Sequence, residues 1–248
     1  MPDAVRRNSL AELNALELYL SAPHPCAYLP GKTAQMIFLP PDIPLSMPTY
    51  NRLVGEGFRR SGDLVYRPRC PGCSACVPVR IPARHFRPNR SQKRCFKCNQ
   101  DLEVIARAPE FHPDHYHLYQ RYLKARHPDG SMADATPDDY MAFLTCHWCE
   151  TLFYEFRRQG KLVMVAVVDL LDDGLSAVYT FFDPELSRRG LGTYAVLWEI
   201  AAIKRLEMEY LYLGYWIETC PQMAYKSKFR PQQRYQMGAW RTPSPKPP

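Results

Sequence analysis

The stretch LSAVYTFFDPELSRRGLGTYAVLWEIAAIKRLEM, residues 175–208, decides the fold. Its first ten residues are rich in aromatic and β-branched side chains, which predicts a strand that ends at Pro184. Residues 192–208 place apolar side chains at helical spacing and form the strongest helix pattern in the chain. The segment SRRGLG, residues 187–192, is therefore expected to be a glycine-containing turn between strand and helix.

The neighbouring segments extend this pattern into a sheet. Upstream, TLFYEFRR and KLVMVAVVDLL predict two more strands, and turn residues at 159–160 and 172–174 make the three strands an antiparallel meander. Two helices are expected before them, in HPDHYHLYQRYLKARH and DDYMAFLTCHW, where Cys146 and Cys149 lie beside Trp148. Downstream, EYLYLGYWI predicts one further buried strand.

This order of elements resembles the acyl-CoA N-acyltransferase fold, in which the turn after the central strand binds the phosphates of an acyl carrier at a helix N-terminus. The usual pattern of that turn begins with Gln or Arg, and Ser187 stands there in this chain, which counts against acetyl-CoA as the donor. The expected fold class is α+β, with a C-terminal acyl-CoA N-acyltransferase-like mixed sheet, flanking helices and a smaller basic N-terminal α+β region.

The N-terminal part has a different character. Residues 8–20 predict a short amphipathic helix, and residues 21–48 carry seven prolines, which predicts an extended, irregular segment. Strands are expected in LVYRP, VPVRIP and QDLEVIARA. The expected parts are a basic, cysteine-containing domain at 1–105, an N-acyltransferase-like domain at 106–240 and a flexible tail at 241–248.

Composition and charge narrow the class of protein. With 248 residues and 46% hydrophobic side chains, the chain can bury a substantial core, and no apolar run or signal peptide predicts a membrane segment, so a cytoplasmic location is expected. The net charge of +7 is N-terminal, because residues 1–105 hold 15 basic and 8 acidic side chains. Residues 52–97 alone hold 12 basic and 2 acidic side chains, which predicts a surface for a polyanion or an acidic substrate.

The segment YRPRCPGCSACVPVRIPARHFRPNRSQKR, residues 66–94, resembles the N-terminal motif of the aminoacyl-tRNA–protein transferases, both the bacterial leucyl and the eukaryotic arginyl types. The segment PCAYLPG at 25–31, which lacks the second cysteine of the eukaryotic CxxC, is similar to the bacterial aspartate/glutamate leucyltransferase branch. Matching blocks follow in the same order: YQRYLKARHPDGSM, SAVYTFFDPELSRRGLGTYAVL and YLYLGYWIETCPQMAYKSKFRP.

The resemblance implies an enzyme that moves an aminoacyl group, expected to be leucine, from charged tRNA to the α-amine of proteins that begin with Asp or Glu. The product would carry an N-terminal degradation signal, so the implied partners are aminoacyl-tRNA, acidic N-terminal proteins and the downstream degradation machinery, with no membrane. The aminoacyl ester is already activated, so the reaction needs an uncharged, positioned amine more than it needs a protein nucleophile. An α-amine has a pKa of about 7.7–8.0, and a modest base suffices to free it.

Candidate residues follow from these needs. Arginine binds a carboxylate with two parallel hydrogen bonds, so Arg80 is the first candidate to read the acidic acceptor, followed by Arg90 and Lys93. In RYLKARHPDGSM the catalytic candidates are His127 as the proton relay, Tyr122 as the group for the leaving ribose hydroxyl, and Arg126. The candidates for binding tRNA phosphates are Arg94, Lys226, Lys228 and Arg230.

The nine cysteines leave two metal sites open. Cys73, Cys76, Cys95 and Cys98 have the spacing of a structural zinc ribbon, with Cys70 as an alternative ligand. The related eukaryotic enzymes suggest instead a zinc or iron–sulfur site formed by Cys26, Cys70, Cys73 and Cys76. No cofactor is required by the expected reaction.

Three functions stay open at this point. The first is the tRNA-dependent transferase, for which arginine remains an alternative to leucine because both branches share the basic motif. The second is an acyl-CoA-dependent N-acetyltransferase, favoured by the fold and by SRRGLG. The third is a zinc-ribbon module that binds nucleic acid without catalysis, favoured by the CxxC pairs and the basic region.

Overall fold

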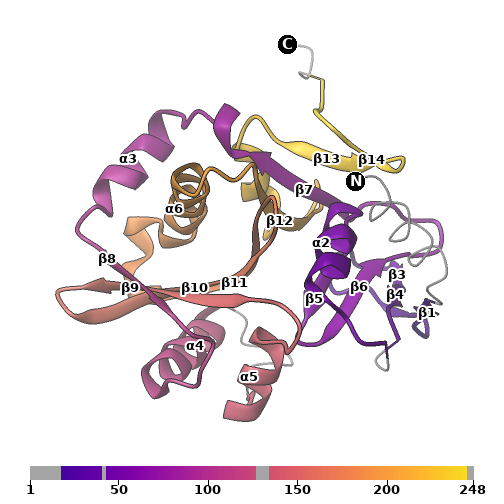
Figure 1. Cartoon of the computed structure of the whole chain (residues 1–248), viewed down its shortest axis with the longest axis horizontal. Coiled ribbons are helices and arrows are strands. Elements are labelled where there is room, and N and C mark those ends of the chain that lie inside the picture. The colour runs from indigo at the N-terminus through magenta and orange to yellow at the C-terminus, as the bar shows by residue number, and fades with distance from the viewer. Residues whose placement is uncertain (1–17, 41–42, 127–133, 245–248) are drawn as a thin grey trace, which may run out of the picture.

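An eight-stranded mixed sheet forms the centre of the computed structural model, which describes residues 18–40, 43–126 and 134–244 (Figure 1). Its strand order is β14-β13-β7-β12-β11-β10-β9-β8. The strands are β7 (Val77–Pro82), β8 (Glu103–Arg107), β9 (Thr151–Arg158), β10 (Lys161–Leu170), β11 (Gly174–Phe182), β12 (Tyr210–Trp216), β13 (Gln233–Gln236) and β14 (Ala239–Arg241).

Helices cover both faces of this sheet (Figure 1). On one face lie α3 (Arg90–Cys98) and α6 (Leu191–Arg205), and on the other lie α4 (Pro113–Arg126) and α5 (Pro137–Leu144). Strand β10 runs between the two layers, and its residues from Leu162 to Val168 are all buried, which explains its unbroken apolar sequence. Short 3₁₀ turns complete this half: η1 (Ala83–His85), η2 (Pro184–Arg189) and η3 (Ala224–Lys228).

The N-terminal residues build a smaller four-stranded sheet of order β1-β4-β6-β5, beside the two-stranded pair of β2 and β3. Its elements are β1 (Tyr19–Leu20), β2 (His24–Pro25), β3 (Thr33–Ala34), β4 (Met36–Phe38), α2 (Met47–Gly55), β5 (Arg59–Ser61) and β6 (Leu64–Pro68). Buried side chains of α2, β4 and β6 pack against Leu171 and Tyr212 of the large half. One core therefore joins the small sheet to the large one.

The expected α+β class is confirmed, with the predicted meander in β9, β10 and β11, the turn in η2, the long helix in α6 and a further strand in β12. One expected helix is shorter than predicted. Helix α5 ends at Leu144 because Thr145 adopts an extended conformation, and its hydroxyl donates to the Met141 carbonyl oxygen. Cys146 and Cys149 therefore follow the helix instead of lying on it.

Two N-terminal expectations also differ from the structure. Tyr19 and Leu20, assigned to a helix, pair with Phe38 and Ile37 as a strand, whereas residues 8–17 of that expected helix lie outside the described residues. Helix α3 was not expected, although a capping box of Asn89 and Gln92 opens it.

The expected domain boundary between residues 105 and 106 falls inside strand β8. Strand β7, also from the N-terminal part, lies between β12 and β13 of the large sheet. The division of the chain into domains stays a prediction.

Candidate active site

A fork between β11 and β12 opens the sheet at its centre. The two strands pair in parallel over three residues each, Gly174–Ser176 with Tyr210–Tyr212. Beyond that point no pairing joins the described residues of β11 to β12, and the register of β12 against β7 shifts between Tyr212 and Gly214. The second halves of the strands are therefore free to form the two walls of a cavity.

The cavity in this fork encloses about 890 Å³. Its apolar wall comes from the second half of β11 and from the facing side chains Phe143, Leu191, Val196, Leu213 and Met223. Six elements and one loop contribute polar and aromatic groups, among them Tyr28, Arg59, Arg60, Tyr66, Tyr122, Arg126, Glu199, Tyr215, Tyr225 and Lys226.

Arg59 holds the fork open from the small sheet. Its Nη1 donates to Ser176 Oγ at 2.7 Å and its Nη2 to the Ala177 carbonyl oxygen, where β11 leaves β12. Gly214 makes room for this side chain, because a Cβ atom at Gly214 would lie 3.1 Å from Arg59 Nε. The backbone of Gly214 also has φ +72°, a conformation that favours glycine.

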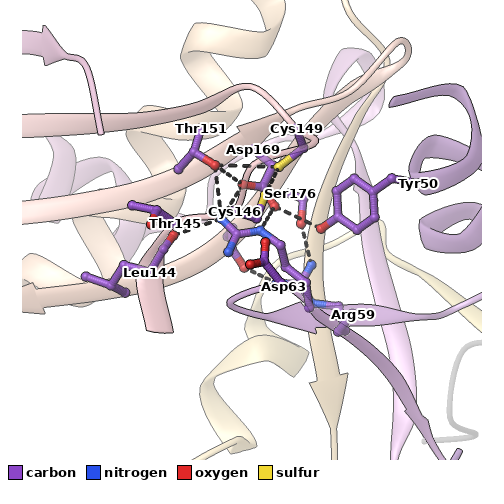
Figure 2. A network of polar contacts seen from close by, with 12 residues as sticks. Tyr50, Arg59, Asp63, Leu144, Thr145, Cys146, Cys149, Thr151, Asp169 and Ser176 are labelled. Atoms are coloured by element: carbon purple, nitrogen blue, oxygen red, sulfur yellow. Dashed lines mark hydrogen bonds and ion pairs between the residues drawn. The ribbon is translucent and has the colours of Figure 1, made fainter. Parts of the chain in front are cut away.

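Arg60, the next residue of β5, forms a buried ion pair with Asp169 of β10. Its Nε and Nη2 donate to the two carboxylate oxygens at 2.8 and 2.6 Å, and Nη2 also donates to Thr151 Oγ1. Asp169 accepts further bonds from Tyr50 and Thr151, and Figure 2 shows these side chains converging on its carboxylate. Burial lowers the pKa of Arg60, but the bonds and charge of Asp169 outweigh it and raise the pKa. The ion pair fixes β5, and thereby Arg59, against the large sheet.

Two ionisable groups of the cavity, Glu199 and Lys226, have pKa values shifted toward neutral pH. Burial raises the pKa of Glu199 to about 8, and the positive charge of Arg59 opposes that shift. Burial and the charge of Arg59 lower the pKa of Lys226 to about 7, and Lys226 Nζ donates to the Tyr215 carbonyl oxygen at 2.6 Å. Both groups therefore titrate near neutral pH, where an α-amine also titrates.

A second hollow of about 390 Å³ adjoins the cavity at the N-terminus of α6. Gly190, Thr193 and Tyr225 line both hollows. Gly190 caps α6 in the left-handed conformation (φ 65°), and no side chain caps the first turn of this 15-residue helix. The basic residues of this second hollow are Arg94, Arg188, Arg189 and Lys228, which makes its surroundings suitable for an anion.

The structure brings some of the sequence-predicted residues together. Tyr122, Arg126 and Lys226 line the cavity, with the Arg126 guanidinium 5.7 Å from the centre of the Phe182 ring. Arg94 and Lys228 line the hollow at α6. His127 lies outside the described residues.

Other predicted residues lie elsewhere. Arg80 lines neither hollow, and its Nε and Nη1 donate to Gln233 Oε1 (2.8 Å) and Tyr212 Oη (3.1 Å). Its guanidinium lies 3.6 Å from the ring centre of Tyr210 and 4.6 Å from that of Trp240, as a cation–π contact. The remaining three, Arg90, Lys93 and Arg230, are exposed.

Sequence reasoning missed Arg59 and Glu199 as site residues. In the sequence, Arg59 is one of many basic side chains, and no local pattern shows that it reaches Ser176. Glu199 did carry a signal. It follows Val196 by three residues and precedes Ile203 by four, so it lies on the apolar face of the strongest helix pattern, where an unpaired acid is costly.

The cysteines gather in a way that favours one of the two open metal sets. Burial, together with the nearby Cys70, Cys26 and Cys73, raises the pKa of Cys76 to about 11, so the four cysteines of the second set lie near one another. Cys95, by contrast, contacts the carbonyl oxygens beside α6. In the described part of the chain no three His, Cys, Asp or Glu side chains are arranged to hold a metal ion. A cysteine-bound zinc or iron–sulfur site stays a prediction.

An open fork, an apolar wall and groups that titrate near neutral pH suit the transfer of an acyl group to an amine. Comparison with known proteins identifies the kind of transfer. Residues 24–94 match the family described as arginine-tRNA-protein transferase, N terminus, and residues 114–236 match arginine-tRNA-protein transferase, C terminus.

Two relatives make the assignment more specific. The aspartate/glutamate leucyltransferase of Nitrosococcus oceani is 54% identical over 226 residues, which cover 90% of this chain and 94% of that one. The enzyme of the same name from Pseudomonas fluorescens is 50% identical over 222 residues, with the same coverage of both chains. This chain belongs to the aspartate/glutamate leucyltransferase family and is an aminoacyltransferase.

Among solved structures, the chain is similar to L-PGS from Bacillus licheniformis, with a TM-score of 0.46 and 9% sequence identity. The match covers 58% of this chain and 47% of that one. None of the helices in the described ranges has the length and hydropathy of a membrane span.

Proposed function

We propose that this chain transfers leucine from leucyl-tRNA to the α-amine of proteins that begin with Asp or Glu, and that the transfer takes place in the cavity between β11 and β12. The observation that carries this proposal is the joining of two different hollows. One is basic and lies at a helix N-terminus, and the other has an apolar wall and is lined by ionisable groups.

The donor fits this pair of hollows with its phosphates in the basic hollow and its aminoacyl end in the cavity. The phosphates of the tRNA acceptor end bind around Arg94, Arg188 and Lys228, which are exposed cations beside the uncapped first turn of α6. The aminoacyl ester then passes Gly190 and Thr193 into the cavity, because these residues border both hollows.

The donated leucine side chain lies against the apolar wall of the cavity. Val178, Phe182 and Val196 supply apolar surface there. The cavity carboxyl, Glu199, is protonated below a pH of about 8, because burial raises its pKa to that value. An arginine guanidinium in the cavity would either stay unpaired or pair with Glu199 at the cost of ionising a buried acid, and both are unfavourable.

The enzyme recognises the acceptor protein through the side-chain carboxylate of its first residue. Arg126 lines the cavity on the side of Tyr122 and is a candidate for that contact. Arg80, Arg90 and Lys93 stay candidates as well, although Arg80 would have to give up bonds to Gln233 and Tyr212. The modified protein then carries leucine at its N-terminus, which is the signal for the degradation machinery.

The test is transfer of labelled leucine from leucyl-tRNA to four peptides that differ only in a first residue of Asp, Glu, Asn or Gln. We expect Asp and Glu peptides to be labelled at least about tenfold faster, since a lost bond to a charged group costs about 1.5–3 kcal/mol. Labelled acetyl-CoA in place of leucyl-tRNA should give no product. Equal labelling of all four peptides, or labelling from acetyl-CoA, would contradict the proposal.

A further inference from the structure

Glu199 is a buried acid that the fold does not use. Its side chain lies on α6, with 1% of the residue exposed, and neither carboxylate oxygen has a hydrogen-bond partner among the described residues. Buried polar groups in folded proteins are nearly always bonded, so an exception calls for an explanation. Because Glu199 lines the cavity, a group of the substrate is the natural partner.

The charges around Glu199 limit what that partner can be. Arg59 from β5 supplies positive charge, while Tyr225 from η3 and Tyr154 from β9 are near enough for Glu199 to raise their pKa values. The other basic groups of the cavity are Arg60, Arg126 and Lys226, of which Arg60 is bound to Asp169. Its remaining ionisable groups are the phenols of Tyr28, Tyr66, Tyr122, Tyr179 and Tyr215. An unpartnered carboxyl group favours a proton or a hydrogen-bond donor, and an amine supplies both.

In the proposed function two amines enter the cavity, the α-amine of the acceptor and the α-amine of the donated leucine. The inference rests on that function. The attacking α-amine of the acceptor arrives as an ammonium group and must lose a proton before it has a lone pair. We propose that Glu199 is the catalytic base that accepts this proton.

The reaction then balances as follows. The Glu199 carboxylate takes one proton from the ammonium group, which leaves a neutral amine and a neutral carboxyl group. The amine nitrogen bonds to the ester carbonyl carbon, and the bond from that carbon to the ribose oxygen of the tRNA breaks. The ribose oxygen takes a second proton from the attacking nitrogen, and the Glu199 carboxyl group releases its own proton to water.

The acid strength of Glu199 suits this step. Its pKa of about 8 lies near the usual pKa of an α-ammonium group, about 7.7–8.0, so the proton passes between them with a small change in free energy. A general base works best when its pKa lies near the working pH. An ordinary glutamate would be a much weaker base toward this amine.

The test measures single-turnover transfer from labelled leucyl-tRNA to a Glu-starting peptide between about pH 6.5 and 9, spanning the amine pKa. Near pH 7, Glu199→Gln should be slower than the unchanged protein by about a hundredfold or more. The defect should shrink to about tenfold or less near pH 9, because water then frees the amine without a protein base. The matched control is Glu207→Gln, an exposed glutamate beyond the end of α6, which should behave like the unchanged protein.

Two further measurements separate catalysis from a structural role. The melting temperature of Glu199→Gln should stay equal or rise, since the change removes a buried acid that has no described partner. Glu199→Asp keeps a carboxyl group and should keep the pH profile of the unchanged protein at a lower rate.

The failures are distinguishable. A defect in Glu199→Gln that stays constant across the pH range, or no defect at all, would overturn the role of Glu199 alone. An unchanged protein that transfers no leucine to the peptide at any pH would overturn the proposed function, and this inference with it.

Discussion

Arg59 and Arg60 are neighbours on β5, and their side chains bind different partners. Side chains alternate along a strand, so consecutive residues reach different surroundings. Arg59 reaches Ser176 and Ala177 at the fork of the large sheet, and Arg60 reaches the carboxylate of Asp169. A three-residue strand thereby sets one cation against the fork and anchors itself with the other.

The anchor gives a prediction at the same scale. Arg60→Met should lower the free energy of unfolding by about 3–5 kcal/mol, because it leaves the buried Asp169 carboxylate without its cation. Chemical denaturation measures this loss. The double variant Arg60→Met, Asp169→Asn should recover a substantial part of it, since no buried charge is then left unpaired. If the single variant unfolds like the unchanged protein, the ion pair does not hold β5.

At the scale of elements, long and regular patterns could be predicted from the sequence. The strands β9 and β10, the helix α6 and the turn before it have clear periodicity and turn residues, and they lie where the sequence placed them. Helix α3 was missed because its nine residues are strongly polar and their basic side chains indicated a binding segment. The pairing of β7 with β12 and β13 joins distant parts of the chain, and local patterns carry no information on it.

The prediction at this scale concerns tRNA binding in the hollow at the N-terminus of α6. Each phosphate contact releases counterions from tRNA, so the logarithm of tRNA affinity falls linearly with the logarithm of salt concentration. Neutralising Arg94→Gln or Lys228→Gln should reduce this slope by about 1 for each residue. Titrating labelled tRNA at several salt concentrations measures the slope. The control is Lys32→Gln, an exposed lysine beside β3. If the slope changed equally in the control, tRNA phosphates would not bind specifically in this hollow.

The whole molecule shows why the candidate site was only partly predictable. The cavity takes Arg59 and Tyr66 from the small sheet, Tyr122 from α4, and Glu199 from α6, so no single segment contains it. Motifs placed Tyr122, Arg126 and Lys226 among the candidates, and these residues do meet in the cavity. Arg59 and Glu199 line one cavity only when the N-terminal sheet packs on the large one.

We propose that the same assembly determines which donor the enzyme accepts. The apolar wall formed by Val178, Phe182 and Val196 suits leucine, and Glu199 is largely uncharged at neutral pH. An arginine side chain would have to bring its guanidinium into that space unpaired, which is costly, or pair it with Glu199, which could then no longer accept the proton of the acceptor amine.

The most direct test of this account is therefore a comparison of donors at neutral pH. Leucyl-tRNA and arginyl-tRNA, each labelled in the amino acid, are given separately to the unchanged protein with the same Asp-starting peptide, and the rate per bound tRNA is measured. The account predicts transfer of leucine at least about fivefold faster than arginine, since burying an unpaired polar group costs about 1–3 kcal/mol. Equal or faster transfer of arginine would contradict it.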